Sequence, residues 1–208
     1  MSRPVLVLGT GNRKKLSELV DLLGPLGFDL KPLAEFSKAI TVEETGDSFA
    51  TNAALKATVQ ASHLGQWVLG EDSGLAVDAL KGAPGIFSAR FSDPGATDER
   101  NNQKLLAELA KIPLEKRTAH YVCHATLADP SGTVRADAEG WCQGRIRFDY
   151  AGSGGFGYDP LFEIVEYHRT FGELAPEVKA MLSHRARAIR QMIPAMLRLI
   201  DSAQWTQQ

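Results

Sequence analysis

The sequence has little of several features that would place it in a special class. Its 208 residues include two cysteines, Cys123 and Cys142, without a Cys-x-x-Cys pattern, so no disulfide scaffold is indicated. Apolar runs are only a few residues long, too short for a membrane span of about 20 residues. The net charge is −2, so no global basic field attracts nucleic acid. We expect a cytoplasmic protein with reduced thiols, no signal peptide, and neither a membrane nor a nucleic-acid partner.

The sequence has the composition and pattern of an α/β protein. Its apolar fraction of 44% and charged fraction of 23% are typical of a globular chain with a sizeable core. Helical and extended patterns alternate early and a hairpin follows, which predicts a mixed rather than a purely parallel sheet. We predict strands at 5–8, 28–31, 66–69, 75–80, 119–128 and 133–142, and helices at 13–23, 49–65, 97–111 and 184–200. The segments 70–74, 81–96 and 151–160 are predicted turns or loops.

A short basic-glycine segment follows the first apolar run. Val5–Leu8 is predicted to be a buried strand that turns at Gly9-Thr10-Gly11-Asn12 and enters a helix beginning Arg13-Lys14-Lys15. Backbone N–H groups at a helix N-terminus bind anions, and Asn12 is suited to cap the helix. Lysine in a first turn opposes the helix dipole, which a bound phosphate would compensate. The alternative is a glycine turn with solvated lysines.

Acidic pairs occur at two places. Glu71-Asp72-Ser73-Gly74 follows a predicted buried strand, at the kind of strand end where α/β proteins bind ligands. Carboxylates there suit Mg²⁺, which takes one or two of them together with phosphate oxygens; the alternative is a solvated turn. Glu43-Glu44 could complete a metal site or be ordinary surface charge. Lys56, on the helix that follows, has little independent support as a functional residue.

A glycine loop and a polar helix start complete the candidate residues. Gly154–Pro160 combines backbone freedom with Phe156, Tyr158 and Asp159, a set that can stack on a planar base and hydrogen-bond its edge, or anchor a turn. Ser183-His184-Arg185 offers a cap and two donors. Phosphate donors, carboxylates and an aromatic loop together indicate a nucleotide phosphohydrolase that uses metal-assisted water attack.

The ordered motifs resemble the inosine triphosphate pyrophosphatases, also called dITP/XTP diphosphatases. The resemblance spans about residues 5 to 200 and is carried by Thr10-Gly11-Asn12-x-x-Lys15, Glu43–Gly46, Asn52–Lys56, Asp72–Leu80, Gly82–Arg90, Gly155–Pro160, and Lys179 with Ser183-His184-Arg185. Glu71 stands where the family often has aspartate, and the tail after Ile200 has no motif.

The resemblance implies Mg²⁺-dependent hydrolysis of ITP, dITP and XTP to the monophosphate and pyrophosphate, which cleanses the nucleotide pool of deaminated purines. It also implies a homodimer and a single domain over residues 1–208, with a mixed, long-stranded central sheet, flanking helices and two lobes around a substrate cleft.

Residue roles follow from the same resemblance. Asp72 would accept a proton from the attacking water and bind the metal together with Glu43. The substrate would be bound by Thr10, Gly11, Asn12, Arg13, Lys14, Lys15, Lys56, Ser73, Phe156, Gly157, Tyr158, Asp159, Lys179, His184 and Arg185. In that set Phe156 would stack on the base.

Two alternatives remain open. A Maf-like pyrophosphatase would act on pyrimidine or methylated nucleotides, but the Phe156–Asp159 and Ser183–Arg185 motifs argue against it. A nucleotide sensor without turnover would keep Lys15 and the base pocket but would have no use for Asp72.

Overall fold

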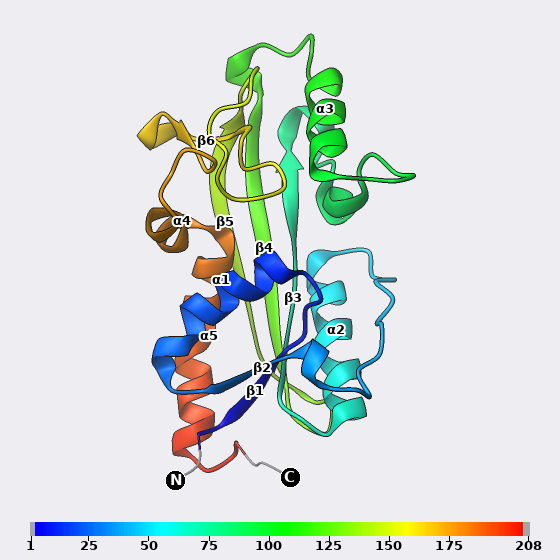
Figure 1. Ribbon diagram of the computed structural model, residues 1–208, viewed down its shortest axis with the longest axis vertical. Helices are drawn as coiled ribbons and strands as arrows, with labels where there is room; N and C mark the ends of the chain where they lie inside the picture. The colour runs from blue at the N-terminus through cyan, green and yellow to red at the C-terminus, as the bar shows by residue number, and fades with distance from the viewer. Residues whose placement is uncertain (1–2, 206–208) are drawn as a thin grey trace. The chain divides into compact units, whose positions relative to one another are not determined.

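The computed structural model describes residues 3–205, which form a seven-stranded sheet in the order β2-β1-β3-β4-β5-β6-β7 (Figure 1). The strands are β1 (Val5–Leu8), β2 (Asp29–Pro32), β3 (Val68–Val77), β4 (Thr118–Ala128), β5 (Val134–Ile146), β6 (Phe162–Ile164) and β7 (Arg169–Thr170). The helices are α1 (Arg13–Leu23), α2 (Phe49–Leu64), α3 (Asp98–Glu108), α4 (Pro176–Leu182) and α5 (His184–Asp201). Strands β2 and β3 run parallel to β1, whereas β6 is antiparallel to β5 and β7, so the predicted mixed sheet is confirmed.

The described chain divides into two compact units. The first contains the residues up to Asp72, Cys123–Gly140 and those from Arg185 onward; the second contains Ser73–Val122 and Trp141–His184. Strands β3, β4 and β5 each contribute residues to both units. The expectation of a single domain stays a prediction. None of the helices in residues 3–205 is both long and apolar enough to cross a bilayer.

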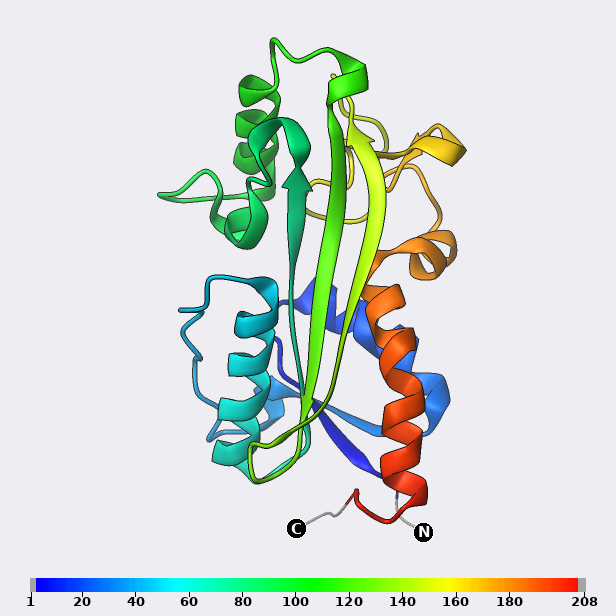
Figure 2. The same ribbon diagram turned by 180° about the vertical axis from the view of Figure 1, so that it is seen from behind.

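Helices cover both faces of the sheet in the first unit. Leu6, Leu8 and Leu69 pack with α1 and α5 on one face, while Val7 and Val68 pack with α2 on the other. Adjacent strand residues point to opposite faces, which accounts for this division. Figures 1 and 2 show α5 and α2 on opposite sides of these strands.

Three helices begin at polar capping residues, and the predicted cap at Asn12 is confirmed. Asn12 caps α1, Ser48 caps α2 through a reciprocal capping box with Thr51, and Thr97 caps α3. Side-chain oxygens of these residues satisfy N–H groups that have no partner within the helix. Helix α3 ends at Glu108, a few residues before the predicted end.

The predicted break at residues 70–74 is wrong, because β3 continues from Val68 to Val77. The glycine in the middle serves a close approach instead of a turn. A Cβ at Gly70 would lie 2.6 Å from both the carbonyl oxygen of Ala53 and the amide nitrogen of Ala57. Only glycine therefore lets α2 pack this closely on the strand.

The second unit has its own core and elements that the sequence pattern missed. Tyr121, Phe162 and Phe171 are buried there with Leu105 of α3. The predicted loop 81–96 contains a 3₁₀ segment, η4 (Gly85–Arg90), and the short strands β6 and β7 were not predicted. Segments of two or three residues carry too little periodicity to be found from sequence.

The chain from Ser202 to Trp205 folds back onto the rest of the first unit. The Trp205 ring stacks on Trp67 with centroids 4.2 Å apart and contacts Phe28 at 5.3 Å. Its indole N–H donates to the Val5 carbonyl at 3.3 Å, and the side chain is buried. This part of the chain, which has no motif, thus closes the core beside β1.

We expect Trp205→Ala to lower the free energy of unfolding by about 3 kcal/mol, because it empties a buried aromatic site. Trp141→Ala is the matched control, since Trp141 is largely exposed, and it should cost about 1 kcal/mol or less. Urea unfolding measures both. Equal losses in the two variants would show that Trp205 does not close the core.

Candidate active site

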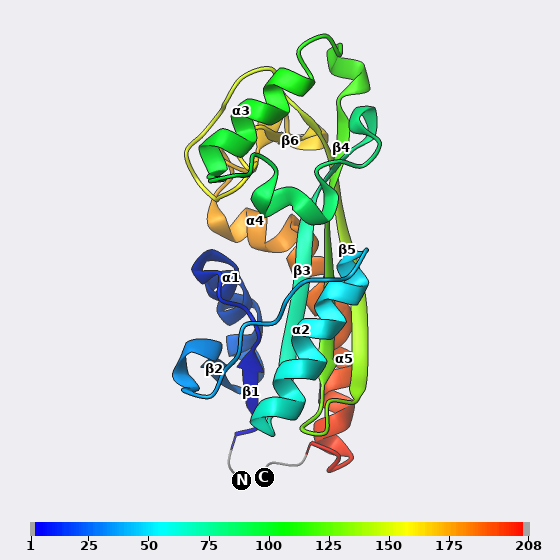
Figure 3. The same ribbon diagram turned by 90° about the vertical axis from the view of Figure 1, so that its right-hand side faces the viewer.

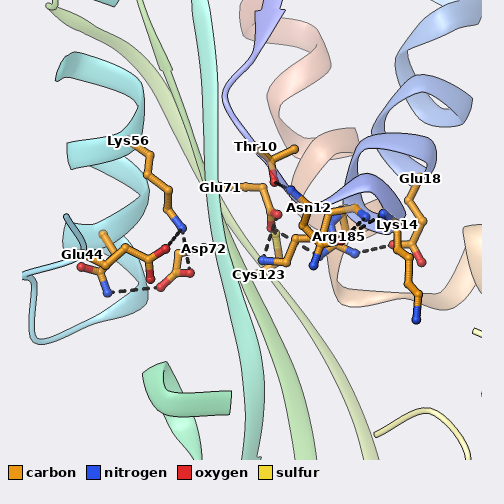
Figure 4. A network of polar contacts seen from close by, with 12 residues as sticks. Thr10, Asn12, Lys14, Glu18, Glu44, Lys56, Glu71, Asp72, Cys123 and Arg185 are labelled. Atoms are coloured by element: carbon orange, nitrogen blue, oxygen red, sulfur yellow. Dashed lines mark hydrogen bonds and ion pairs between the residues drawn. The ribbon is translucent and has the colours of Figure 1, made fainter. Parts of the chain in front are cut away.

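The acidic pair at residues 71 and 72 is divided between the two faces of β3 (Figure 4). Glu71 points toward α1 and α5, and Asp72 points toward α2. The interpretation of these two carboxylates as one metal-binding pair is therefore wrong. Side-chain alternation along a strand separates neighbours, and the sequence prediction had placed both residues in a turn.

Asp72 is nearly buried and has partners from α2. Its Oδ1 lies 3.0 Å from the Lys56 ammonium, and its Oδ2 accepts from the Asn52 amide at 3.3 Å. Burial raises the pKa of Asp72 above its ordinary value, although Lys56 and Lys15 oppose the shift. A buried carboxylate with a raised pKa is a stronger proton acceptor than a solvated one.

Glu44, rather than Glu43, faces Asp72. The Glu44 carboxylate lies 3.0 Å from the same Lys56 ammonium that pairs with Asp72. Glu43 and Glu44 are both exposed residues. Burial alone would lower the pKa of Lys56, but the carboxylates of Asp72 and Glu44 raise it above its usual value. Lys56 is therefore a charged group held between two carboxylates, a role that its helical position alone did not indicate.

Asn52 joins these groups to the segment that precedes α2. Its Oδ1 accepts from the Gly46 amide at 2.8 Å while its Nδ2 donates to Asp72, and the side chain is fully buried. Asn52 belongs to one of the ordered motifs, but its sequence position did not predict a function for it. The signal in the sequence was an asparagine among the small residues of a predicted helix.

Glu71 is the buried partner of two cations on the other face of β3. Its Oε1 lies 3.1 Å from the Lys15 ammonium and its Oε2 lies 3.4 Å from the Arg185 guanidinium. Arg185 is itself buried and also pairs with Glu18. Burial acts to raise the pKa of Glu71, but Arg185 and Lys15 hold it well below its ordinary value.

The same network contains Cys123. Its thiol lies 3.4 Å from Glu71 Oε2, and burial, followed by the charge of Glu71, raises the pKa of this thiol well above its ordinary value. Cys123 is thus a buried residue with a free thiol. Cys142 is also buried and reduced.

The basic turn before α1 has the expected local structure. The Asn12 side chain accepts from the amides of Lys14 and Lys15 at 2.9 and 3.2 Å, and Thr10 Oγ1 accepts from the Asn12 amide. Arg13 and Lys14 are exposed, as is Gly11. Lys15 is unfavourable next to the positive end of the α1 dipole, and the negative charge of Glu71 offsets it. A bound phosphate is therefore not needed to stabilise Lys15 at this position.

A second cluster of predicted residues lies within the second unit. Asp159 is buried; its Oδ2 accepts from the Phe156 amide at 2.8 Å and from the Lys179 ammonium at 2.6 Å. Lys179 also lies 4.6 Å from the centroid of the half-buried Phe156 ring. The structure thus joins Lys179 of α4 to the turn at residues 156–159, which we call the aromatic turn.

Buried neighbours surround this cluster. Tyr121 donates to Asp159 Oδ1 at 3.3 Å, and its ring stacks on His184 at 4.7 Å. Tyr158 is buried and donates to the Ser88 carbonyl at 2.8 Å, so its side chain anchors the turn. Tyr121 was not found from the sequence, where it is one apolar position of a strand.

The two faces of the first unit carry different chemistry. Next to Asp72, a buried proton acceptor lies beside a lysine and a second carboxylate; next to Glu71, cations surround one carboxylate behind the basic turn. Such a combination is chemically suited to binding an anionic substrate and activating water. In residues 3–205 no three His, Cys, Asp or Glu residues gather closely enough to hold a metal ion by themselves.

Comparison with known proteins then establishes the family. A sequence model of the Ham1 family matches residues 6–195, and the chain belongs to this family. A dITP/XTP pyrophosphatase from Rhodopirellula baltica is 56% identical over 197 residues, covering 95% of each chain. Another from Desulforamulus reducens is 46% identical, covering 93% of this chain and 96% of that protein.

Solved structures agree in fold. A HAM1 protein from Coxiella burnetii has a TM-score of 0.85 and 36% identity, covering 93% of this chain and 98% of that one. A Ham1 protein from Staphylococcus aureus has a TM-score of 0.82 and 34% identity, with the same coverage. The resemblance found in the ordered motifs is thereby confirmed.

We expect Glu71→Gln to lower the free energy of unfolding by about 3 to 5 kcal/mol near neutral pH, because Arg185 and Lys15 lose a buried counter-charge. The pKa of Glu71 is lowered in the folded state, so its stabilising effect is present above the unfolded-state pKa of about 4.3 and is lost as the pH falls below that value.

Urea unfolding of wild type and variant from about pH 7 to about pH 3 checks this expectation. The difference between the two proteins should shrink toward the acid end. Glu43→Gln, at the exposed acidic position, is the control and should change little. A difference that stays constant over the whole pH range would show that the lost interaction is not ionic.

Proposed function

We propose that this chain hydrolyses non-canonical purine nucleoside triphosphates (ITP, dITP and XTP), whose bases are 6-oxo purines without the 2-amino group of guanine, to the monophosphate and pyrophosphate, and so cleanses the nucleotide pool. The observation that carries the proposal is Asp72, a buried carboxylate with a raised pKa that is held by Lys56 and Asn52. The Ham1 relatives named dITP/XTP pyrophosphatase support the substrate class.

Asp72 acts as the proton acceptor. A water molecule that attacks a phosphorus atom of the triphosphate must lose a proton, and the Asp72 carboxylate takes it. Lys56 and Asn52 fix the two oxygens of that carboxylate. The Lys56 ammonium also provides positive charge near the phosphate oxygens, where negative charge increases in the transition state.

The carboxylates on this face suit Mg²⁺. Glu44 and Asp72 each lie 3.0 Å from one positive charge, that of Lys56, so they already converge on a cationic centre. Two carboxylate donors, with water and phosphate oxygens in the other positions, match the ligands that Mg²⁺ takes in nucleotide enzymes. When bound, Mg²⁺ would neutralise phosphate charge. We assign the second ligand to Glu44 in place of Glu43.

The basic turn binds the triphosphate. Thr10, Gly11 and Asn12 present the turn, Arg13 and Lys14 are exposed beside it, and Lys15 lies behind them with its ammonium on Glu71. Because Asn12 already caps the amides of Lys14 and Lys15, we assign the phosphate contacts chiefly to the basic side chains. Ser73, which follows Asp72 in β3, remains a proposed substrate contact.

The aromatic turn recognises the base. Phe156 stacks on the purine, Gly157, Tyr158 and Asp159 shape the turn, and Lys179 and His184 supply donors for a 6-oxo acceptor. Arg185 pairs with Glu18 and Glu71 in the first unit and is left out of this set. Adenine carries a 6-amino donor there and would leave such donors unpaired, at a cost of about 1–3 kcal/mol per group.

The proposal also includes the oligomeric state and location of the enzyme, which we expect to be a cytoplasmic homodimer.

The first test is pyrophosphate release from ITP, XTP, GTP, ATP and dTTP with Mg²⁺, each paired with an EDTA control. We expect metal-dependent release chiefly from ITP and XTP. Asp72→Asn should lower kcat for ITP by about 10²-fold or more, because the proton acceptor is lost together with one metal ligand. Most of the ITP binding should remain, because the basic turn and the aromatic turn are unchanged.

Each other outcome points elsewhere. Release from dTTP would favour a Maf-like pyrophosphatase, and ITP binding without any release would favour a sensor. Near-normal turnover by Asp72→Asn would remove Asp72 from its assigned role.

The ligand assignment is tested by a matched pair of neighbouring variants. Glu44→Gln should raise the Mg²⁺ concentration needed for half-maximal activity by about tenfold, because one carboxylate ligand is lost. Glu43→Gln should leave this concentration unchanged. Mg²⁺ titration of ITP hydrolysis measures both. If Glu43→Gln raised this Mg²⁺ concentration and Glu44→Gln did not, Glu43 would be the second ligand.

A further inference from the structure

The aromatic turn contains a glycine whose backbone conformation is fixed by groups outside the turn. Gly157 lies between Phe156 and Tyr158 with φ +62°, in the left-handed region, and a Cβ there would meet nothing within 4 Å. Glycine is therefore needed for its backbone angle and not for space. Since glycine adopts many backbone angles with similar ease, other groups must select this one.

Helix α3 supplies those groups. Asp98 Oδ2 accepts from the Gly157 amide at 3.0 Å, and Asn102 Nδ2 donates to the Gly157 carbonyl at 2.9 Å. The two side chains are four residues apart, so they lie on one face of the helix. Figure 3 shows α3 beside the loop that contains Gly157.

The two hydrogen bonds hold different peptide units. The Gly157 amide belongs to the peptide that joins it to Phe156, and its carbonyl belongs to the peptide that joins it to Tyr158. Holding both units fixes φ and ψ of Gly157 together. Because the first of these peptide units also contains the Phe156 carbonyl, the backbone direction at Phe156 is fixed as well. The position of the Phe156 ring depends on that direction.

Asn102 costs stability where it stands. The residue is buried, and within residues 3–205 its Oδ1 has no hydrogen-bond partner. A buried acceptor without a partner costs roughly 1–3 kcal/mol, whereas an aliphatic side chain would fill the site without that cost. Residues that break a local rule of stability in this way mark positions under a functional constraint.

We propose that Asp98 and Asn102 are positioning residues for base recognition, which hold Gly157 so that Phe156 presents its ring to the purine. The proposal rests on the proposed function, in which Phe156 stacks on the base. Neither residue touches the substrate. The contribution of α3 is separate from that of Asp159 and Lys179, which hold the other end of the turn.

The test compares Asn102→Leu and Asp98→Ala with Gln103→Ala. Gln103 is an exposed residue of the same helix whose amide donates to Glu99, so its variant is the control. The measurements are Tm, kcat and KM for ITP, and inhibition by inorganic pyrophosphate, a product without a base.

We expect each of the two variants to raise KM for ITP about tenfold, with kcat and pyrophosphate inhibition within about threefold of wild type. The Tm of Asn102→Leu should change little, because removal of the unpaired Oδ1 offsets the loss of the donor to the half-buried Gly157 carbonyl. Asp98→Asn should restore KM, since its amide oxygen can still accept from Gly157. Gln103→Ala should match wild type.

Four results would overturn the proposal. A lower Tm with unchanged KM would make the contacts structural only, and an equal loss of pyrophosphate inhibition would place the effect outside base recognition. If wild type failed to hydrolyse ITP, the proposed function would fail and this proposal with it. If wild type were active and Asn102→Leu had normal KM, this proposal alone would fail.

Discussion

The alternation of side chains along β3 is the constraint on which the site in the first unit depends. Glu71 and Asp72 are neighbours in sequence, yet the strand directs one toward α1 and α5 and the other toward α2. Two adjacent carboxylates on one face would repel each other and raise the cost of burial. Placed on opposite faces, each can be buried with its own cations and take a different chemical role.

The partners of these carboxylates come from elements far apart in the sequence. Lys56 reaches Asp72 because α2 packs tightly over Gly70, and Arg185 reaches Glu71 from the first turn of α5. An unpaired buried charge is strongly destabilising, so each pairing links the stability of the fold to the geometry of the site. The lowered pKa of Glu71 and the raised pKa of Asp72 reflect the two surroundings.

In the second unit, the aromatic turn is fixed by side chains outside it. Lys179 and Tyr121 hold Asp159, Ser88 accepts from Tyr158, and α3 holds Gly157. A glycine-rich turn has little conformational preference of its own, because glycine loses more conformational freedom on ordering than other residues do. The surrounding hydrogen bonds offset that entropy, so the shape of the turn depends on the packing of the whole unit.

The sequence alone determined the elements that have strong local signals. Helix α1 and the starts of α2, α3 and α5 follow from caps and apolar periodicity, and the ordered motifs identified the family and most candidate residues. It did not show that β3 is continuous through Gly70. A glycine at this position fits a turn as well as it fits a strand that a helix approaches closely. Nor did it show that Glu44 faces Asp72, that Glu71 pairs with Arg185, or that Trp205 closes the core. These are contacts between distant segments, and only the packed chain brings such partners together.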